Sequence, residues 1–344
     1  MLLPFNRAEA QAAATHTLFG KLQNRADFVR VNANHPAALE LDQLIQQSYE
    51  RATPLDEQPA SPANFLYTTR DRRYTAIGVA MPSRDQAGRK YPLVAAAILP
   101  REALEADLPL SPIAYEVFFD GLREQVINAV ENSVEALSCR QFLETTLRSY
   151  EASASDDLQL ARNVAERFLD SWSCAQVQGF LAGDLPGTTL HQALLNMAFY
   201  QAHLRHFDNR ATNQLIGLPL GQQKGEQALL ASLWLNILAS LFPARSRQEP
   251  WNCSYFIHSP AGGPARLVVS LGRMPDGFTG AMLGTPTPPS LMLDLSQEQG
   301  AWSSHRMYAE VSYALSRMLA DPEVRLAPLC SLLEGIGRQL DRDG

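Results

Sequence analysis

One run of the sequence, Tyr-Pro-Leu-Val-Ala-Ala-Ala-Ile-Leu at residues 91–99, limits the fold more than any other feature. It carries no charged side chain. Such a run is typical of a strand with both faces covered, because successive side chains point to opposite faces and here neither set is polar. Two runs rich in β-forming residues precede it, at 64–70 and 72–81. We therefore predict three neighbouring strands at the centre of a sheet that is flanked by helices.

The order of the remaining patterns predicts an α/β (α+β) protein with an antiparallel sheet. Short strands are expected at 17–21 and 28–31, followed by a helix that begins near Pro36, a residue suited to a first helical turn. After the three strands, the apolar spacing at 111–132 predicts a helix. Helices are then expected at 138–150, 156–172, 189–207, 226–242, 304–319 and 323–340, and strands at 213–220, 253–259, 265–272 and 289–295.

The first and last parts of the chain share an element order: strand, helix, three strands, helices. We therefore hypothesise two related α/β modules joined by a helical segment, although no residue-level repeat is visible. The predicted division is an α/β domain at 1–135, a helical connector at 136–210 and a second α/β domain at 211–344.

Charge and apolar runs exclude several classes of protein. The formal net charge is −7, whereas duplex-binding proteins gather Lys and Arg to neutralise phosphates, so we expect no nucleic-acid partner. The densest basic run, Arg70–Arg73, falls in a predicted turn. The uncharged run at 227–244 contains Asn236, and Pro243 stops a helix near its end. Both features favour a buried helix over a membrane span. We expect a cytoplasmic protein without membrane insertion.

No motif in the sequence points to catalysis, a cofactor or a metal. Gly20-Lys21 lacks the earlier glycine and the following hydroxyl of a phosphate-binding loop, and no Gly-x-Ser-x-Gly occurs. The four cysteines form no Cys-x-x-Cys pair, which favours buried free thiols. We therefore predict no enzyme, no catalytic residue, no cofactor and no metal site. A hydrolase whose residues converge only in the folded chain is one alternative.

Two motifs resemble a known family. Phe-Gly-Lys-Leu-Gln-Asn-Arg-Ala-Asp-Phe-Val, at 19–29, resembles the GKLPxxGDFV signature of TagF proteins, also called ImpM. Met-Pro-Ser-Arg-Asp-Gln-Ala-Gly-Arg-Lys-Tyr-Pro-Leu, at 81–93, resembles their PSxDxxGRxFPL stretch. Ala26 stands where the family has glycine, which puts the shape of the first turn in doubt if that turn needs a positive φ. The matching residues that we take as candidates for partner binding are Gly20, Lys21, Leu22, Asp27, Phe28, Ser83, Asp85, Gly88, Arg89 and Pro92.

The resemblance implies regulation rather than catalysis. TagF-like proteins are accessory proteins of the bacterial type VI secretion system and look like post-translational repressors that bind a cytoplasmic forkhead-associated scaffold protein. The element order of the first part also looks like a longin or profilin-like module, a class that usually binds other proteins. A structural or adaptor component of the secretion apparatus is a second alternative.

The polar residues of the two motifs allow two interpretations. They could form a cluster at one end of the sheet that grips a partner. Alternatively, Asp27 and Arg89 could pair to hold the two loops together, because a bidentate contact between arginine and a carboxylate is well suited to that role. The two interpretations are compatible, since a fixed loop presents a better docking surface.

Overall fold

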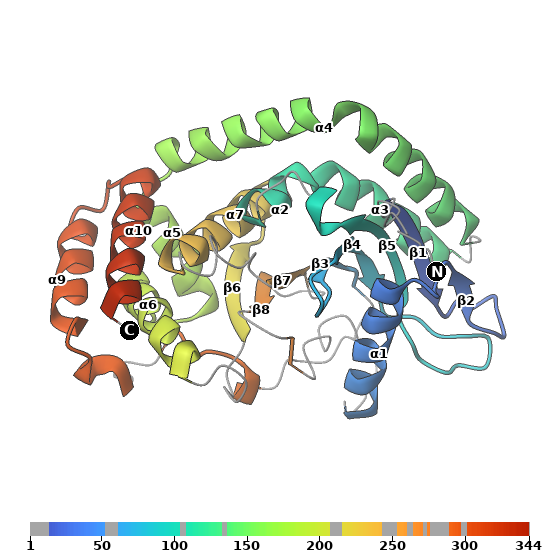
Figure 1. The fold of residues 1–344 in the computed structure, drawn as a ribbon, viewed down its shortest axis with the longest axis horizontal. Helices are drawn as coiled ribbons and strands as arrows, with labels where there is room; N and C mark the ends of the chain where they lie inside the picture. Colours follow the sequence, from blue (N-terminus) through green and yellow to red (C-terminus); the bar gives the residue numbers. More distant parts are fainter. Residues whose placement is uncertain are drawn as a thin grey trace, which may run out of the picture.

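The computed structural model describes residues 14–51, 61–103, 108–132, 136–206, 215–242, 253–259, 264–270, 274–275, 289–296 and 301–343. Its centre is one sheet with the strand order β2-β1-β5-β4-β3-β7-β8-β6, and every pairing is antiparallel (Figure 1). The strands are β1 (Thr15–Gly20), β2 (Val29–Val31), β3 (Ala63–Thr68), β4 (Tyr74–Met81), β5 (Leu93–Pro100), β6 (Leu215–Gly221), β7 (Ser254–His258) and β8 (Ala265–Ser270). The antiparallel sheet flanked by helices is confirmed.

Helices cover both faces of the sheet. One face carries α1 (Pro36–Arg51), and the other carries α3 (Glu116–Glu131) and α7 (Lys224–Leu241). The long helix α4 (Leu137–Ser171) arches over this second face from one end of the sheet to the other (Figure 1). The other α-helices among the described residues are α2 (Ser111–Ala114), α5 (Cys174–Asp184), α6 (Leu190–His206), α9 (Tyr308–Leu319) and α10 (Leu326–Asp343). The described helices include none with the combined length and apolar character needed to cross a bilayer.

The prediction for the apolar run at 91–99 is confirmed in β5. Its side chains alternate between two hydrophobic clusters, with Val94 packed on the α1 side and Ala95 packed on the α3 side. Both residues are fully buried. Burial on two faces explains why this strand carries no polar residue, because neither side has water to solvate one.

The sheet is continuous across the middle of the sequence. Strand β3 pairs with β7, so residues from the first third of the chain lie beside residues from the last third. At this seam the Thr68 amide donates to Ser254 Oγ at 3.0 Å, and the hydroxyls of Ser111 and Tyr255 lie 2.9 Å apart. The sheet and the largest core cluster thus cross the predicted boundaries at 135 and 210. The three-part division stays a prediction.

The hypothesis of two related modules stays a prediction. The first part pairs β1 with β5, β5 with β4 and β4 with β3, and the last part pairs β6 with β8 and β8 with β7. The helix that follows the first strand of each part packs on a different face of the continuous sheet, with α1 on one face and α7 on the other.

Several predicted elements also differ. The helices expected at 138–150 and 156–172 are one helix, α4, and α5 forms where no helix was predicted. The helix expected at 111–132 is divided at Tyr115 into α2 and α3. The strand expected at 289–295 is a short 3₁₀ turn followed by a single bridge between Met292 and Leu215.

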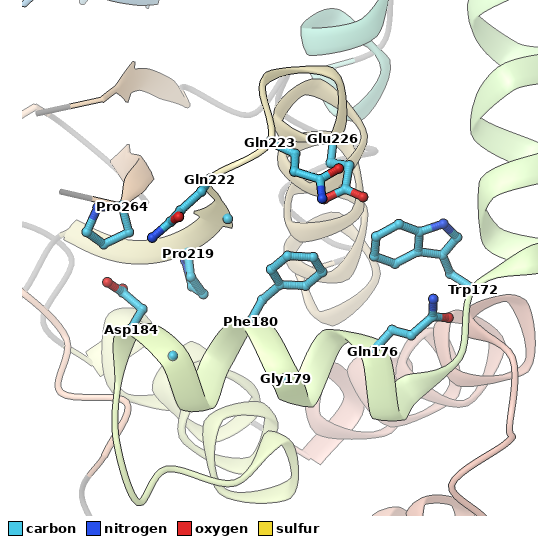
Figure 2. Close-up of a pocket in the computed structure, with 12 residues that line it drawn as sticks. Trp172, Gln176, Gly179, Phe180, Asp184, Pro219, Gln222, Gln223, Glu226 and Pro264 are labelled. Atoms are coloured by element: carbon cyan, nitrogen blue, oxygen red, sulfur yellow. The ribbon is translucent and has the colours of Figure 1, made fainter. Parts of the chain in front are cut away.

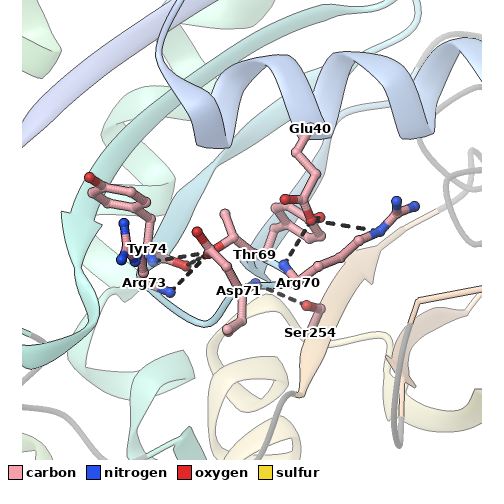
Figure 3. Close-up of polar contacts among 9 residues, drawn as sticks. Glu40, Thr69, Arg70, Asp71, Arg73, Tyr74 and Ser254 are labelled. Atoms are coloured by element: carbon pink, nitrogen blue, oxygen red, sulfur yellow. Dashed lines mark hydrogen bonds and ion pairs between the residues drawn. The ribbon is translucent and has the colours of Figure 1, made fainter.

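The basic run Arg70–Arg73 forms the β3–β4 turn, as predicted (Figure 3). Asp71 organises the turn by accepting hydrogen bonds from the Thr69 hydroxyl at 2.6 Å and the Arg73 amide at 3.0 Å. Arg72 takes the left-handed conformation, with φ 61°. Glu40 on α1 accepts from the Arg70 amide at 2.8 Å, so the turn is also fixed to the covering helix. The run therefore serves the hairpin.

Candidate functional site

The two motif loops lie against each other at the end of the sheet that carries β1 and β5. Loop 21–28 connects β1 to β2, and loop 82–92 connects β4 to β5. The Ser83 hydroxyl donates to the Lys21 carbonyl at 2.7 Å, and the Gln86 amide donates to the Arg25 carbonyl at 3.0 Å. We call the two loops together the clip. The sequence motifs at 19–29 and 81–93 thus form one structural unit.

Asp85 is the centre of the clip. Its side chain is 1% exposed and lies 3.2 Å from Lys21 Nζ and 2.7 Å from Arg89 Nε. The amides of Ala87 and Arg89 also donate to it, at 3.0 and 2.9 Å. Desolvation opposes ionisation of this carboxyl, but the hydrogen bonds from Arg89 and Lys21 outweigh it and lower the pKa of Asp85. Asp85 is thus a buried carboxylate with a full set of donors, which is a structural arrangement.

Arg89 links Asp85 to the first loop. Besides its contact with Asp85, its Nη2 donates to the Ala26 carbonyl at 3.0 Å. The predicted pair between Asp27 and Arg89 is therefore wrong: Asp27 is exposed, and Arg89 pairs with Asp85, four residues before it. Ala26 is not among the residues with positive φ, so this turn adapts to alanine without a left-handed residue.

Glycine is required where β1 enters the clip. Gly20 has φ +134°, and a Cβ built there would lie 2.1 Å from the Pro92 carbonyl oxygen. The obstacle is backbone, so it cannot rotate away. Gly88 also has a positive φ, of +81°, but a Cβ there would meet nothing within 4 Å. Gly20 therefore serves a close approach between loops, whereas Gly88 serves the turn that places Asp85 and Arg89 together.

Phe28 and Leu22 anchor the first loop to the core. Leu22 is 1% exposed and belongs to the main hydrophobic cluster. The Phe28 ring packs on Tyr91 with centroids 4.9 Å apart, and Lys21 Nζ and Arg30 Cζ lie 5.7 and 5.4 Å from its centroid. Contacts of this length are within the range of cation–π attraction. Half-buried Phe28 therefore joins apolar packing to the charged cluster.

Sequence reasoning missed the role of Tyr91. Its hydroxyl donates to the Asp42 carboxylate, and burial together with this contact raises its pKa. Asp42 lies on α1, so Tyr91 ties the clip to the helix on that face of the sheet. The available signal was the position of Tyr91 within the second motif, immediately before Pro92. The sequence pattern did not identify its partner on α1.

A separate cavity of about 650 Å³ lies at the other end of the sheet, between α5, the end of β6 and the start of α7 (Figure 2). The stacked rings of Trp172 and Phe180 lie in its wall, 5.7 Å apart. Its carboxylates are Asp184 and Glu226, and Asp184 is already paired with Arg266 at 2.8 Å. The other lining residues are Gln176, Gly179, Gly183, Pro219, Gly221, Gln222, Gln223 and Pro264. None of the candidate residues lies there.

The described residues contain no cluster of three His, Cys, Asp or Glu side chains that could hold a metal ion. The clip contains two carboxylates: Asp27 is exposed, and Asp85 is buried and occupied by protein donors. What the clip can do chemically is present a fixed surface to another molecule, because its loops are tied to each other, to the core and to α1.

Residues 17–146 match the model of the TagF N-terminal domain, described as type VI secretion system-associated. No curated protein matches this chain. One solved structure, that of PA0076 from Pseudomonas aeruginosa PAO1, is 28% identical over 38% of this chain and 61% of its own, with a TM-score of 0.28. The chain therefore spans less than two thirds of that relative, and a TM-score this low does not bear on the fold. The part of this chain that contains the clip, residues 17–146, is therefore similar to the N-terminal domain of the type VI secretion-associated TagF proteins.

Proposed function

We propose that this protein is an accessory regulator of bacterial type VI secretion that represses assembly after translation. It binds a forkhead-associated scaffold protein in the cytoplasm, and it acts by binding rather than by catalysis. The observation that supports the proposal is the match of residues 17–146 to a secretion-associated domain. The identity of the scaffold and the direction of the effect come from the resemblance in the two motifs.

The clip suits a protein that acts by binding. Its shape is fixed by Asp85 and by hydrogen bonds between the loops, so docking costs little conformational entropy in the clip. Repression then follows from mass action: scaffold bound to this protein is removed from the pool available for assembly. A tighter complex removes a larger share of that pool.

The hydrolase alternative gains no support from the large cavity. Its lining residues include no Ser, Thr, Cys, His or Lys, so they supply neither a serine nor a cysteine nucleophile with a histidine base. The clip holds its one buried carboxylate, Asp85, among four donors rather than open to a substrate.

The experiment is a deletion of the gene in a host with an active type VI system, with secreted effector measured by immunoblot. We expect more secretion in the deletion strain and a return to the original level when the full chain is supplied in trans. Reduced secretion in the deletion strain would instead identify a component of the apparatus. A purified-protein binding assay with the host's forkhead-associated scaffold tests the partner separately.

A further inference from the structure

The solvent-facing side of the clip is basic. Residues 21–31 and 82–92 expose one carboxylate, that of Asp27. The same two segments expose five cations, which are Arg25, Arg30, Arg84, Arg89 and Lys90. The whole chain has a formal net charge of −7, so the cations are concentrated here against the overall sign. We call these five residues the basic rim.

Two of the rim cations are placed directly against each other. Arg84 and Lys90 form an antiparallel bridge across the second loop, and both are exposed. Like charges in directly opposite positions destabilise an antiparallel pair. This bridge places two like charges opposite each other at the exposed end of the second loop.

The rim adjoins an edge of the sheet. Strand β2, which carries Arg30, is the outermost strand and pairs only with β1 in the described sheet. A strand at an edge presents main-chain donors and acceptors that an extended polypeptide can pair with. Lipid headgroups and nucleic acids do not offer that complementary main chain. The positive charge of the rim and the edge position of β2 together favour an acidic polypeptide as the binding partner.

We propose that the basic rim docks an acidic, extended segment of a protein partner, with β2 pairing to its main chain. This inference rests on the proposed function for the identity of the partner as the secretion scaffold. The chemistry of the partner's docking segment follows instead from the rim itself. Asp85 contributes by holding Arg89 at the base of the rim, where the exposed part of its side chain faces outward.

The test uses Arg84→Glu in the full chain, because this single change should raise stability and weaken binding. It converts the like-charge bridge with Lys90 into an opposite-charge pair, so we expect a higher Tm. It also reverses one rim charge, so we expect binding to weaken about threefold to tenfold at low salt and less at high salt. The control is Arg167→Glu on α4, an exposed arginine outside the rim, which makes the same change in net charge. We expect the control to bind as the wild type does.

Two probes separate the rim from the identity of the scaffold. The first is the host's forkhead-associated scaffold, and the second is a fluorescent ten-residue glutamate peptide. One outcome is that the peptide binds, that Arg84→Glu weakens this binding, and that the scaffold does not bind. That outcome supports docking at the rim and contradicts the proposed partner. Binding of the scaffold that is equal for wild type and Arg84→Glu/Lys90→Glu overturns the rim and leaves the partner in place.

Two further probes define the chemical class of the occupant: vesicles that contain phosphatidylserine, and a short DNA duplex. Their binding to the wild type and to the same variants is measured. Weak, rim-independent binding of both supports an acidic polypeptide. Rim-dependent binding of either one, tighter than that of the glutamate peptide, overturns the assignment to a protein segment. Failure of the wild type to bind both the scaffold and the peptide also overturns it.

Discussion

Replacing Gly20 by alanine tests whether the close approach of the two motif loops stabilises the clip. The alanine must adopt φ near +134°, a conformation that L side chains rarely take. Strain of this kind costs about 1 to 3 kcal/mol. Its Cβ would also lie 2.1 Å from the Pro92 carbonyl oxygen, and relief of such overpacking costs about 1 to 3 kcal/mol more. We therefore expect a loss of about 2 to 6 kcal/mol, a large part of the ~5 to 15 kcal/mol that stabilises a typical protein.

Two other glycines separate the causes of that loss. Gly88→Ala meets a similar backbone restriction at φ +81° but has nothing within 4 Å of its Cβ, so we expect only the backbone cost of about 1 to 2 kcal/mol. Gly179→Ala lies inside helix α5, also with open space around its Cβ. Alanine is the better helix former, so this variant should gain about 0.5 to 1 kcal/mol.

The free energies of unfolding are measured by urea denaturation with linear extrapolation, with circular dichroism as the signal. The reasoning requires the free energy of unfolding to be highest for Gly179→Ala and then to decrease in the order wild type, Gly88→Ala, Gly20→Ala. A Gly20→Ala protein no less stable than Gly88→Ala would show that the loops separate at little cost. In that case the clip would not be the rigid unit described above.

Three further predictions concern the clip, the thiols and the seam. Asp85→Asn should show a weaker acid dependence of Tm than wild type: the pKa of Asp85 is lowered on folding, so its contribution is present above the ordinary aspartate pKa and is lost as the pH falls through the folded value. An Asn variant with the wild-type pH profile would contradict this. Burial raises the pKa of Cys174 to about 11 and of Cys330 to about 12, so the native protein should react with a thiol reagent much more slowly at pH 8 than the unfolded protein. A truncated chain that ends at residue 146 should self-associate on a sizing column, because the edge of β3 loses its partner β7. A well-behaved monomer would contradict that expectation.

The parts of the fold that could be predicted from the sequence are those that a single local pattern determines. An apolar run such as 91–99 is stable only in a strand with both faces covered, and both faces of β5 are covered. The spacing of four residues predicted a helix: Leu39, Leu41, Leu44 and Ile45. The last three are buried on α1, whereas Leu39 is exposed. Both interpretations used only side-chain periodicity, which the core requires directly.

The parts that did not follow depend on contacts between distant segments. Residues 151–155 lay between two predicted helices, yet α4 runs through them, with α3 packed against one part of this helix and α10 against another. No helix was predicted at 174–184, although Ser173 and Gln176 form the capping box that begins α5. In proteins, most of the stability of a helix comes from tertiary packing rather than from helix propensity.

The candidate site shows the same division. The motifs indicated that two loops belong together, and the loops are in contact. They did not indicate which carboxylate pairs with Arg89, because Asp27 and Asp85 are both plausible from sequence spacing. The choice depends on the turn at Gly88, which brings Asp85 within 2.7 Å of Arg89 Nε while Asp27 remains exposed.

The family match and the structural unit do not end at the same place. The match ends at residue 146, within α4, whereas the sheet continues from β3 into β7 and the main hydrophobic cluster includes residues from both halves. Without β7, the buried hydroxyl of Ser111 would lose Tyr255, and the Thr68 amide would lose Ser254. The last third of the chain therefore covers an edge that would otherwise be open for pairing with another chain. It leaves β2, next to the basic rim, as the outer strand at the clip end of the sheet.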